Sequence, residues 1–220
     1  MRIIVIDDHA LMRELLLGAC REVVPKSTVL GAGDAATGLA LCEEKQPHLV
    51  MLDLALPDRD GLDLLNQLLD ICPHAKVIGL SGYSDEFTLH QVLHSKLHGF
   101  VDKKEQTIDQ LAEAIHAVMR GERYFSENVR NSLRFQRNDP LAFNKILSPR
   151  EQHLLGLFGR GWSNEQIAAL VDLSELTVRN HRCRIMAKLG LRTSAELIRY
   201  AFEKGFTRLE ALSQSASHSA

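Results

Sequence analysis

The stretch HLVMLDLALPDRDG (residues 48–61) joins a buried strand to a charged residue and then to a loop. The apolar run Leu49–Leu52 is followed at once by Asp53, and Pro57 and Gly61 then interrupt the chain. A carboxylate beside a buried strand is costly unless a cation or hydrogen bonds compensate its charge. The stretch therefore predicts a site in which Asp53 meets other polar groups.

Apolar runs of the same kind occur on both sides of this stretch and read as strands: IIVI (3–6), TVLGA (28–32), KVIGL (76–80) and GFV (99–101). Segments with apolar residues at helical spacing lie between them, and LAEAIHAVMRG (111–121) is the last. Alternation of continuous apolar strands with helices is typical of a parallel sheet covered on both faces. We expect an α/β domain over residues 1–121, a flavodoxin-like, doubly wound sheet of five strands.

The remainder of the chain has a different character. Residues 122–146 lose the periodicity and contain an Asp-Pro break, so we interpret them as a linker that could begin as an extension of the last helix. Residues 147–205 predict an all-α domain of four short helices, and residues 206–220 a disordered tail. Helix starts are indicated by SPRE (148–151), SNEQ (163–166) and TSAE (193–196), and helix ends by Gly161, Gly190 and Gly205.

Composition and charge narrow the class of protein. The chain has 220 residues, a net charge of −2 and four cysteines without a CxxC pair, which favours reduced thiols over a disulfide frame. Because no signal-peptide pattern or membrane-length apolar run is present, we expect a cytoplasmic protein without a membrane partner. Residues 1–140 carry 15 basic and 21 acidic residues, whereas residues 141–210 carry 11 and 7. This asymmetry makes nucleic acid a candidate partner for the second part.

Polar residues follow the predicted strands where a doubly wound sheet binds its ligands. Asp7 and Asp8 end the first strand, Asp53 the third and Ser81 the fourth, and Lys103 follows the fifth. Carboxylates this close repel one another unless a cation is present, and oxygen donors with room for water suit Mg²⁺. A nucleophilic carboxylate, a metal, a lysine and a hydroxyl together predict phosphoryl transfer. Taken singly, each of these residues could instead be a helix cap or a solvated side chain.

The motifs VIDDHALMR, VMLDLALPDRDG, VIGLSGY and HGFVDKK resemble, in this order, the receiver domain of two-component response regulators. The resemblance implies that Asp53 accepts the phosphoryl group and that Asp7 and Asp8 form the acidic pocket. It further implies Mg²⁺ as cofactor, bound by Asp8, Asp53 and the backbone carbonyl of Ala55. Ser81 is then the switch hydroxyl, Lys103 the phosphoryl-binding lysine and Phe100 a switch aromatic that turns inward on activation.

The second domain has the layout of a DNA reader. A helix over 164–171, a short turn and a basic helix over 175–189 form a tightly connected pair. A helical wheel places Val178, Ile185 and Leu189 toward the core. We expect the opposite face to enter the major groove, with base contacts from Leu176, Arg179, Asn180 and Cys183. Phosphate contacts are expected from Arg182, Arg184, Lys188 and Arg192, with the stem of Arg182 near the core.

The segments LSPRE, SNEQIA, TVRNH and KLG resemble the helix-turn-helix of LuxR-type regulators, as in response regulators of the NarL/FixJ type. The two resemblances together imply a transcription factor, not an enzyme, that receives its phosphoryl group from a histidine kinase and binds promoter DNA as a homodimer. RNA polymerase is a further possible partner. Two alternatives remain open. The receiver could serve only for phosphorylation-independent dimerisation, or the chain could be a phosphotransfer module whose helical domain binds protein.

Two further features carry weaker hypotheses. His90, His94 and His98 are spaced four residues apart, which permits a metal site, but a solvated or dimer-facing row is favoured because His98 falls beyond the expected helix end. His9 is expected to line the acidic pocket, and His181 to pack against its own domain.

Overall fold

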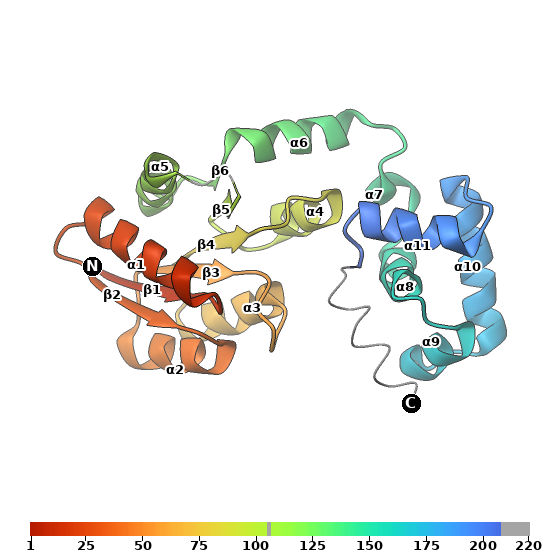
Figure 1. Ribbon diagram of the computed structural model, residues 1–220, viewed down its shortest axis with the longest axis horizontal. Coiled ribbons are helices and arrows are strands. Elements are labelled where there is room, and N and C mark those ends of the chain that lie inside the picture. Colours follow the sequence, from red (N-terminus) through yellow and green to blue (C-terminus); the bar gives the residue numbers. More distant parts are fainter. Residues whose placement is uncertain (105–106, 208–220) are drawn as a thin grey trace. The chain divides into compact units, whose positions relative to one another are not determined.

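The computed structural model describes residues 1–104 and 107–207, except for the side chain of Asn128. The tail expected to be disordered lies, from residue 208 onward, outside the described residues. The described residues form two compact units (Figure 1): the first contains residues 1–84, 91–104 and 107–131, and the second contains residues 85–90 and 132–207. No helix among the described residues is long and apolar enough to cross a membrane.

The first unit is built on a parallel sheet in the order β2-β1-β3-β4-β5-β6. The order reverses direction between β1 and β3, and this is the switch point at which such sheets bind ligands. Each strand is short, and β3 is buried along its whole length. The strands are β1 (Arg2–Ile6), β2 (Thr28–Ala32), β3 (Leu49–Asp53), β4 (Lys76–Ser81), β5 (Gly99–Asp102) and β6 (Tyr124–Phe125).

Helices cover both faces of this sheet (Figure 1), as the continuous apolar strands require. One core cluster joins β1, β3 and β4 to α1 and α5 through residues such as Ile3, Met51 and Leu111. On the opposite face, α2 and α3 pack side by side. The helices that connect the strands are α1 (Ala10–Val23), α2 (Ala35–Lys45), α3 (Gly61–Ile71), α4 (Glu86–His94) and α5 (Ile108–Met119).

The interval expected to be a linker contains regular structure, and this corrects two expectations. The sheet has six strands rather than five, because Tyr124 and Phe125 pair with Gly99 and Phe100 of β5. The last helix of the first unit does not continue into the interval: α5 stops at Met119, and the chain turns at Gly121, where φ is +88°. After β6, two helices follow, α6 (Glu127–Asn138) and α7 (Phe143–Ile146). Two residues are too few for a sequence pattern, so β6 could not be read from periodicity.

The second unit contains the four expected helices: α8 (Pro149–Gly159), α9 (Asn164–Val171), α10 (Glu175–Leu189) and α11 (Ser194–Glu203). Ser148 and Ser163 form full capping boxes with Glu151 and Gln166. Gly161, Gly190 and Gly205 all have positive φ and follow helix ends, as predicted. The core of the unit is aromatic and aliphatic, and it includes Phe143, Leu154, Phe158, Ile167, Val178, Ile185 and Leu197.

Candidate functional site

Asp53 is the last residue of β3 and lies at the carboxyl edge of the sheet, where the sequence places the site. The loop after it folds back closely, since a Cβ on Gly61 would lie 2.7 Å from the carbonyl oxygen of Asp53 and 2.5 Å from the Cα of Leu54. Only glycine therefore allows α3 to begin this close to the strand end. The Oδ1 atom of Asp53 accepts a hydrogen bond of 2.9 Å from the backbone N–H of Ala55. The loop thus holds one carboxylate oxygen of Asp53 in place.

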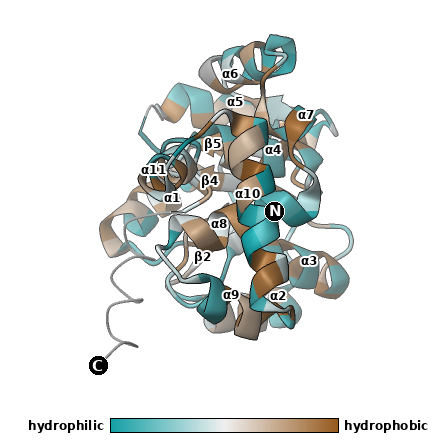
Figure 2. Ribbon diagram, turned by 90° about the vertical axis from the view of Figure 1, so that its right-hand side faces the viewer, coloured by the Kyte–Doolittle hydropathy of each residue, from teal (hydrophilic) through white to brown (hydrophobic). Residues whose placement is uncertain are grey.

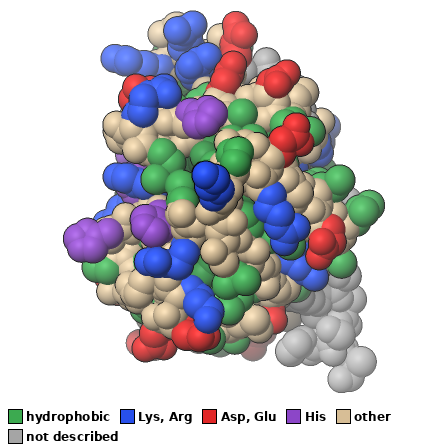
Figure 3. Space-filling view, turned by 90° about the vertical axis from the view of Figure 1, so that its left-hand side faces the viewer, with side chains coloured by type: hydrophobic (Ala, Val, Ile, Leu, Met, Phe, Trp, Pro, Cys, Tyr) green, Lys and Arg blue, Asp and Glu red, His purple; other side chains and the backbone are tan. Residues whose placement is uncertain are grey.

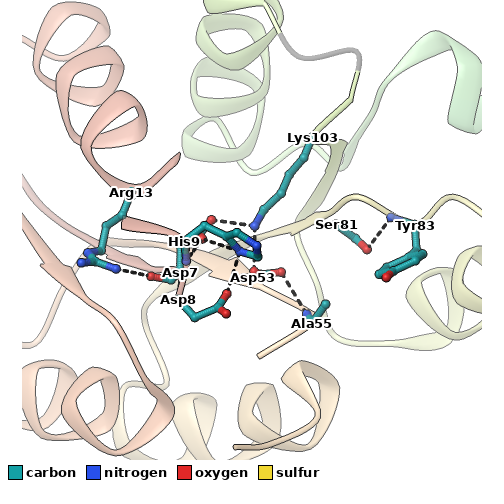
Figure 4. A network of polar contacts seen from close by, with 9 residues as sticks. All are labelled: Asp7, Asp8, His9, Arg13, Asp53, Ala55, Ser81, Tyr83 and Lys103. Atoms are coloured by element: carbon teal, nitrogen blue, oxygen red, sulfur yellow. Dashed lines mark hydrogen bonds and ion pairs between the residues drawn. The ribbon is translucent and has the colours of Figure 1, made fainter. Parts of the chain in front are cut away.

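The other oxygen of Asp53 faces Lys103 (Figure 4). Lys103 Nζ donates to Asp53 Oδ2 over 2.7 Å and lies 2.6 Å from Asp7 Oδ2. Both carboxylates are buried, and the lysine side chain is 11% exposed. Burial raises the pKa of Asp53 above its usual value, while Lys103 and the Ala55 N–H act in the opposite direction. One ammonium thus compensates two buried acids, and this leaves the site acidic.

Asp8 and His9 form the open side of this site. Asp8 is half-buried, and His9 Nδ1 lies 2.9 Å from Asp8 Oδ1 and 3.8 Å from Asp7 Oδ1. The His9 side chain is 72% exposed, so it covers the rim of the pocket, as expected for a lining residue. Beneath the rim, the backbone N–H of His9 donates to Asp7 Oδ1, and Arg13 Nη1 donates to the Asp7 carbonyl oxygen. These bonds fix the turn that presents the acidic pair.

The donor set fits a small hard cation. Side-chain ligand atoms of Asp7, Asp8, His9 and Asp53 all lie within 4.8 Å of one another. Carboxylate oxygens are the ligands that Mg²⁺ takes in proteins, and three carboxylates against Lys103 leave a net negative charge for a cation to neutralise. Among the described residues, this group alone combines ligands at such spacing. His90, His94 and His98 do not form such a group: α4 ends at His94, and His98 Nδ1 accepts the N–H of Val77.

The two expected switch residues lie on neighbouring strands. Ser81 ends β4 and is fully buried, and its hydroxyl oxygen accepts the N–H of Tyr83. Phe100, on β5, is also fully buried. The ring of Phe100 thus lies inside the protein in this structure, and its movement on activation stays a prediction. On β5, Phe100 pairs with Gly79 of β4 and with Phe125 of β6.

The second unit presents the face of α10 that the helical wheel selects. Val178 and Ile185 are buried and Leu189 is half-buried, while the other side is open. Figure 2 faces α10 and shows hydrophilic and hydrophobic residues interspersed along it. Leu176 is 65% exposed. The remaining exposed residues of this side are Arg179, Asn180, Cys183, Arg184 and Ala187. His181 is half-buried, as expected, and Arg192, beyond the helix, is exposed.

Two of the residues expected to contact phosphate, Arg182 and Lys188, have partners inside their own domain. These partners disfavour the predicted phosphate contacts but do not test them. Arg182 lies over the ring of Phe158, with its guanidinium carbon 4.5 Å from the ring centroid, and Nη2 donates to the Trp162 carbonyl oxygen. Lys188 Nζ donates over 2.7 Å to Glu151 Oε2. A helical wheel gives the direction of a side chain but not the neighbours from other helices, so it could not foresee either contact.

Glu151 is a structural residue whose full role the sequence reading missed. Its carboxylate is buried and accepts from both Ser148 N–H and Lys188 Nζ. Burial alone would raise the pKa of Glu151, but hydrogen bonds from Lys188 and Ser148 outweigh it and hold the pKa below its ordinary value. The capping box signals the bond to Ser148, but it carries no sign of the tie to α10. Glu151 therefore links the start of α8 to the end of the exposed helix.

Comparison with known families agrees with both units. Residues 3–116 match the response regulator receiver domain, and residues 145–201 match the bacterial regulatory proteins of the luxR family. The chain belongs to the NarL/FixJ-type two-component response regulators, in which a receiver domain is joined to a LuxR-type DNA-binding domain. It is a transcription regulator rather than a catalytic enzyme. The Asp7, Asp8 and Asp53 pocket is consistent with the phosphorylation site of a receiver, a site that typically binds Mg²⁺.

Individual relatives span nearly the whole chain. The transcriptional regulatory protein MctR of Rhizobium johnstonii is 35% identical over 210 residues, which cover 93% of this chain and 94% of MctR. The oxygen regulatory protein NreC of Staphylococcus aureus is 32% identical over 214 residues, covering 93% and 98%. Among solved structures, RcsB of Salmonella enterica serovar Typhimurium, bound to a promoter with phosphomimetic BeF3−, has a TM-score of 0.62 at 25% identity, covering 91% and 97%.

Proposed function

We propose that Asp53 accepts a phosphoryl group from the phosphohistidine of a sensor kinase. The observation that carries this proposal is the placement of its two oxygens, one held by Ala55 N–H and the other by Lys103. A carboxylate oxygen attacks phosphorus, the P–N bond breaks, and the imidazole of the donor leaves and takes a proton. The Lys103 ammonium stabilises the charge of the transferred group.

Asp8, Asp53 and the backbone carbonyl of Ala55 are the proposed magnesium ligands, with Asp7 beside them. When bound, Mg²⁺ neutralises charge on the phosphoryl oxygens. Asp8 is suited to this role because it is the most exposed of the three carboxylates and lies at the rim. Ser81 and Phe100 are proposed to convey the change. The Ser81 hydroxyl accepts the Tyr83 N–H, and its own O–H remains to donate to a phosphoryl oxygen.

The phosphorylated protein is proposed to act as a homodimer that reads promoter DNA through α10. Support comes from the exposed polar side chains on the outer face of this helix, and RcsB provides a relative bound to a promoter. Arg179 and Asn180, near the start of α10, are suited to guanine and adenine edges respectively. Leu176 could contact a thymine methyl group, and Cys183 lies about two turns further along the helix. Arg184 and Arg192 remain the proposed phosphate contacts.

Labelling with a small phosphodonor such as acetyl phosphate tests the acceptor. Intact-mass measurement in the presence of Mg²⁺ is expected to show one added phosphoryl group on the wild-type protein and none on Asp53→Asn. Asp63→Asn is the matched control, because Asp63 is an exposed carboxylate on α3 and its loss leaves the site intact. Persistent labelling of Asp53→Asn would place the acceptor elsewhere.

Gel-shift measurements at two salt concentrations separate a DNA-binding domain from a protein-binding module, since phosphate contacts give DNA binding a steep salt dependence.

A further inference from the structure

Helix α6, between the two domains in the sequence, carries three arginines on one side. Arg130, Arg134 and Arg137 are spaced by four and three residues, and all three are exposed. At 100° per residue they fall within an arc of about 60°. We call them the α6 arginine row. Figure 3 shows Lys and Arg side chains near its upper edge, with Asp and Glu side chains beside them.

A different side of α6 anchors the helix. Val129 and Gln136, seven residues apart, are 1% and 7% exposed. On the helical wheel they lie about 120° from the centre of the α6 arginine row. The anchored side therefore holds the helix in place while the arginines face solvent. Because the row is not needed for packing, its charge is available to a partner.

The α6 arginine row lacks an acidic partner in the part of the chain that the structure describes. None of the ion pairs found there includes Arg130, Arg134 or Arg137. Glu127 is the one acidic residue of α6 and lies in its first turn, where the helix dipole favours a carboxylate. Three cations thus share one exposed side of α6, and this arrangement suits a polyanion.

The spacing of the row matches a DNA strand. Arg130 and Arg137 are seven residues apart, which corresponds to about 10.5 Å along a helix. One strand of duplex DNA carries a phosphate about every 3.4 Å of helix axis, so this length spans about three phosphates. Arginine also pairs with phosphate through two parallel hydrogen bonds. The row can therefore neutralise consecutive phosphates of a single strand.

An anionic membrane is the other polyanion to weigh, since basic amphipathic helices also bind lipid. Such a helix must insert an apolar face between the lipid headgroups. The apolar residues of α6 are poorly suited to this, because Val129 is buried and Leu133 is half-buried. Phe135, at 78% exposure, is the one exposed large apolar residue among the described side chains of α6. The observations favour DNA.

We propose that the α6 arginine row is a second DNA-binding surface, which contacts the phosphate backbone outside the helix-turn-helix and adds affinity without sequence preference. The proposal rests on the proposed DNA-binding function and extends it to a segment that precedes the luxR-family match at residues 145–201. Contacts to phosphate position a protein on the duplex but do not select a base. The row would then strengthen binding to any duplex.

The test measures fluorescence anisotropy of a labelled duplex of mixed sequence, titrated with the full-length protein between about 50 and 200 mM salt. The variant replaces all three arginines by glutamine, a good helix former. Each phosphate contact contributes about 0.9 to the slope of log K against log salt concentration, so the slope is expected to become shallower by about 2 to 3. Replacing the three arginines by lysine keeps the charge and is expected to retain most of the slope.

A matched control removes the same net charge elsewhere. Arg21→Gln, Lys26→Gln and Lys96→Gln are combined, because all three side chains are exposed on the first unit. This control is expected to keep the wild-type slope. An equal loss of slope in both triple variants would overturn the proposal in favour of a general charge effect. Circular dichroism and thermal unfolding confirm that the variants remain folded.

The remaining outcomes distinguish this proposal from the one on which it rests. If the wild-type protein binds duplex DNA and the glutamine variant has the same slope, the row does not contact DNA, while the proposed function stands. If the wild-type protein does not bind duplex DNA at all, the proposed function fails and this inference with it. Arginine-dependent binding to phosphatidylglycerol vesicles, with an unchanged DNA slope, would assign the row to a membrane instead.

Discussion

Lys103 Nζ lies 2.7 Å from Asp53 Oδ2, which joins the end of β5 to the end of β3 across the carboxyl edge of the sheet. The Asp53 carboxylate is buried and the Lys103 side chain is nearly so, and a second buried carboxylate, Asp7, lies 2.6 Å from the same ammonium. One ammonium group therefore faces two buried carboxylates, so negative charge exceeds positive charge in the site. This imbalance has measurable consequences for stability, because buried charges are costly when they are not fully compensated.

Removing the charge of Asp53 is expected to stabilise the receiver domain at neutral pH. Burial raises the pKa of Asp53 above its unfolded value of about 3.9. A carboxyl whose pKa is raised in the folded state stabilises that state when it is protonated. The stability that Asp53 contributes is therefore present below about pH 3.9 and is lost as pH rises through its folded-state pKa. Asp53→Asn should unfold at higher urea concentration than wild type at pH 7, and this difference should shrink toward pH 4.

Glu14→Gln is the control for this measurement, since Glu14 is exposed on α1. Its effect should stay within about 0.5 kcal/mol at every pH. A lower stability of Asp53→Asn at pH 7 would contradict the prediction.

Loss of the Lys103 ammonium is expected to have the opposite effect. Lys103→Met leaves Asp7 and Asp53 buried without their shared cation, which should lower the free energy of unfolding by about 3 kcal/mol at pH 7. Acidification protonates the Asp53 carboxyl, whose pKa is raised by burial, so the loss should diminish as pH falls. Urea unfolding monitored by circular dichroism measures both effects. Lys104→Met, at an exposed neighbour, should change stability by no more than about 0.5 kcal/mol.

Lys188 and Arg184 are predicted to differ although both are basic residues of α10. Lys188→Met leaves the buried Glu151 carboxylate without its ion pair and should cost about 2 kcal/mol of stability. The lowered pKa of Glu151 means that this stability is present above about pH 4.3, the unfolded value, and is lost as pH falls through the folded pKa. The salt dependence of DNA binding should change little in this variant.

Arg184→Gln provides the contrast, because Arg184 is exposed. It should leave stability unchanged and make the slope of log K against log salt shallower by about 0.9. If Lys188→Met reduced the slope as much as Arg184→Gln, Lys188 would contact phosphate after all.

His98 is predicted to make the first unit sensitive to mild acid. Its Nδ1 accepts the N–H of Val77, so the ring must be neutral at this nitrogen. Burial, with Lys76 and Arg123 nearby, lowers the pKa of His98. The stability that neutral His98 contributes to the folded state is therefore present above about pH 6.5, and it is lost as pH falls through the folded-state pKa of His98. His98→Gln should remove this part of the pH dependence of urea unfolding, worth about 1 kcal/mol. The control variant His74→Gln changes an exposed histidine and should keep this pH dependence of urea unfolding.

Local signals in the chain located many elements of the structure. The predicted helices 164–171 and 175–189 coincide with α9 and α10. Their limits were readable because Ser163 and Ser174 cap the starts and Gly190 ends the second helix, and all these signals act within a few residues. The sequence also predicts that Asp7, Asp53 and Ser81 lie at the same edge of the sheet. Each follows or ends a strand, and parallel strands have their carboxyl ends at one edge.

The amino-acid sequence by itself determined the parallel sheet, the helical second domain and the acidic edge at Asp53, because strand periodicity and helix caps depend on near neighbours. Only the tertiary structure decided the partners of Arg182 and Lys188, the inward position of Phe100 and the pairing of β6. Each of these depends on residues distant in the sequence, such as Glu151 for Lys188. Burial of a charged or aromatic side chain is decided by the surface that folds against it, and a local pattern does not contain that surface.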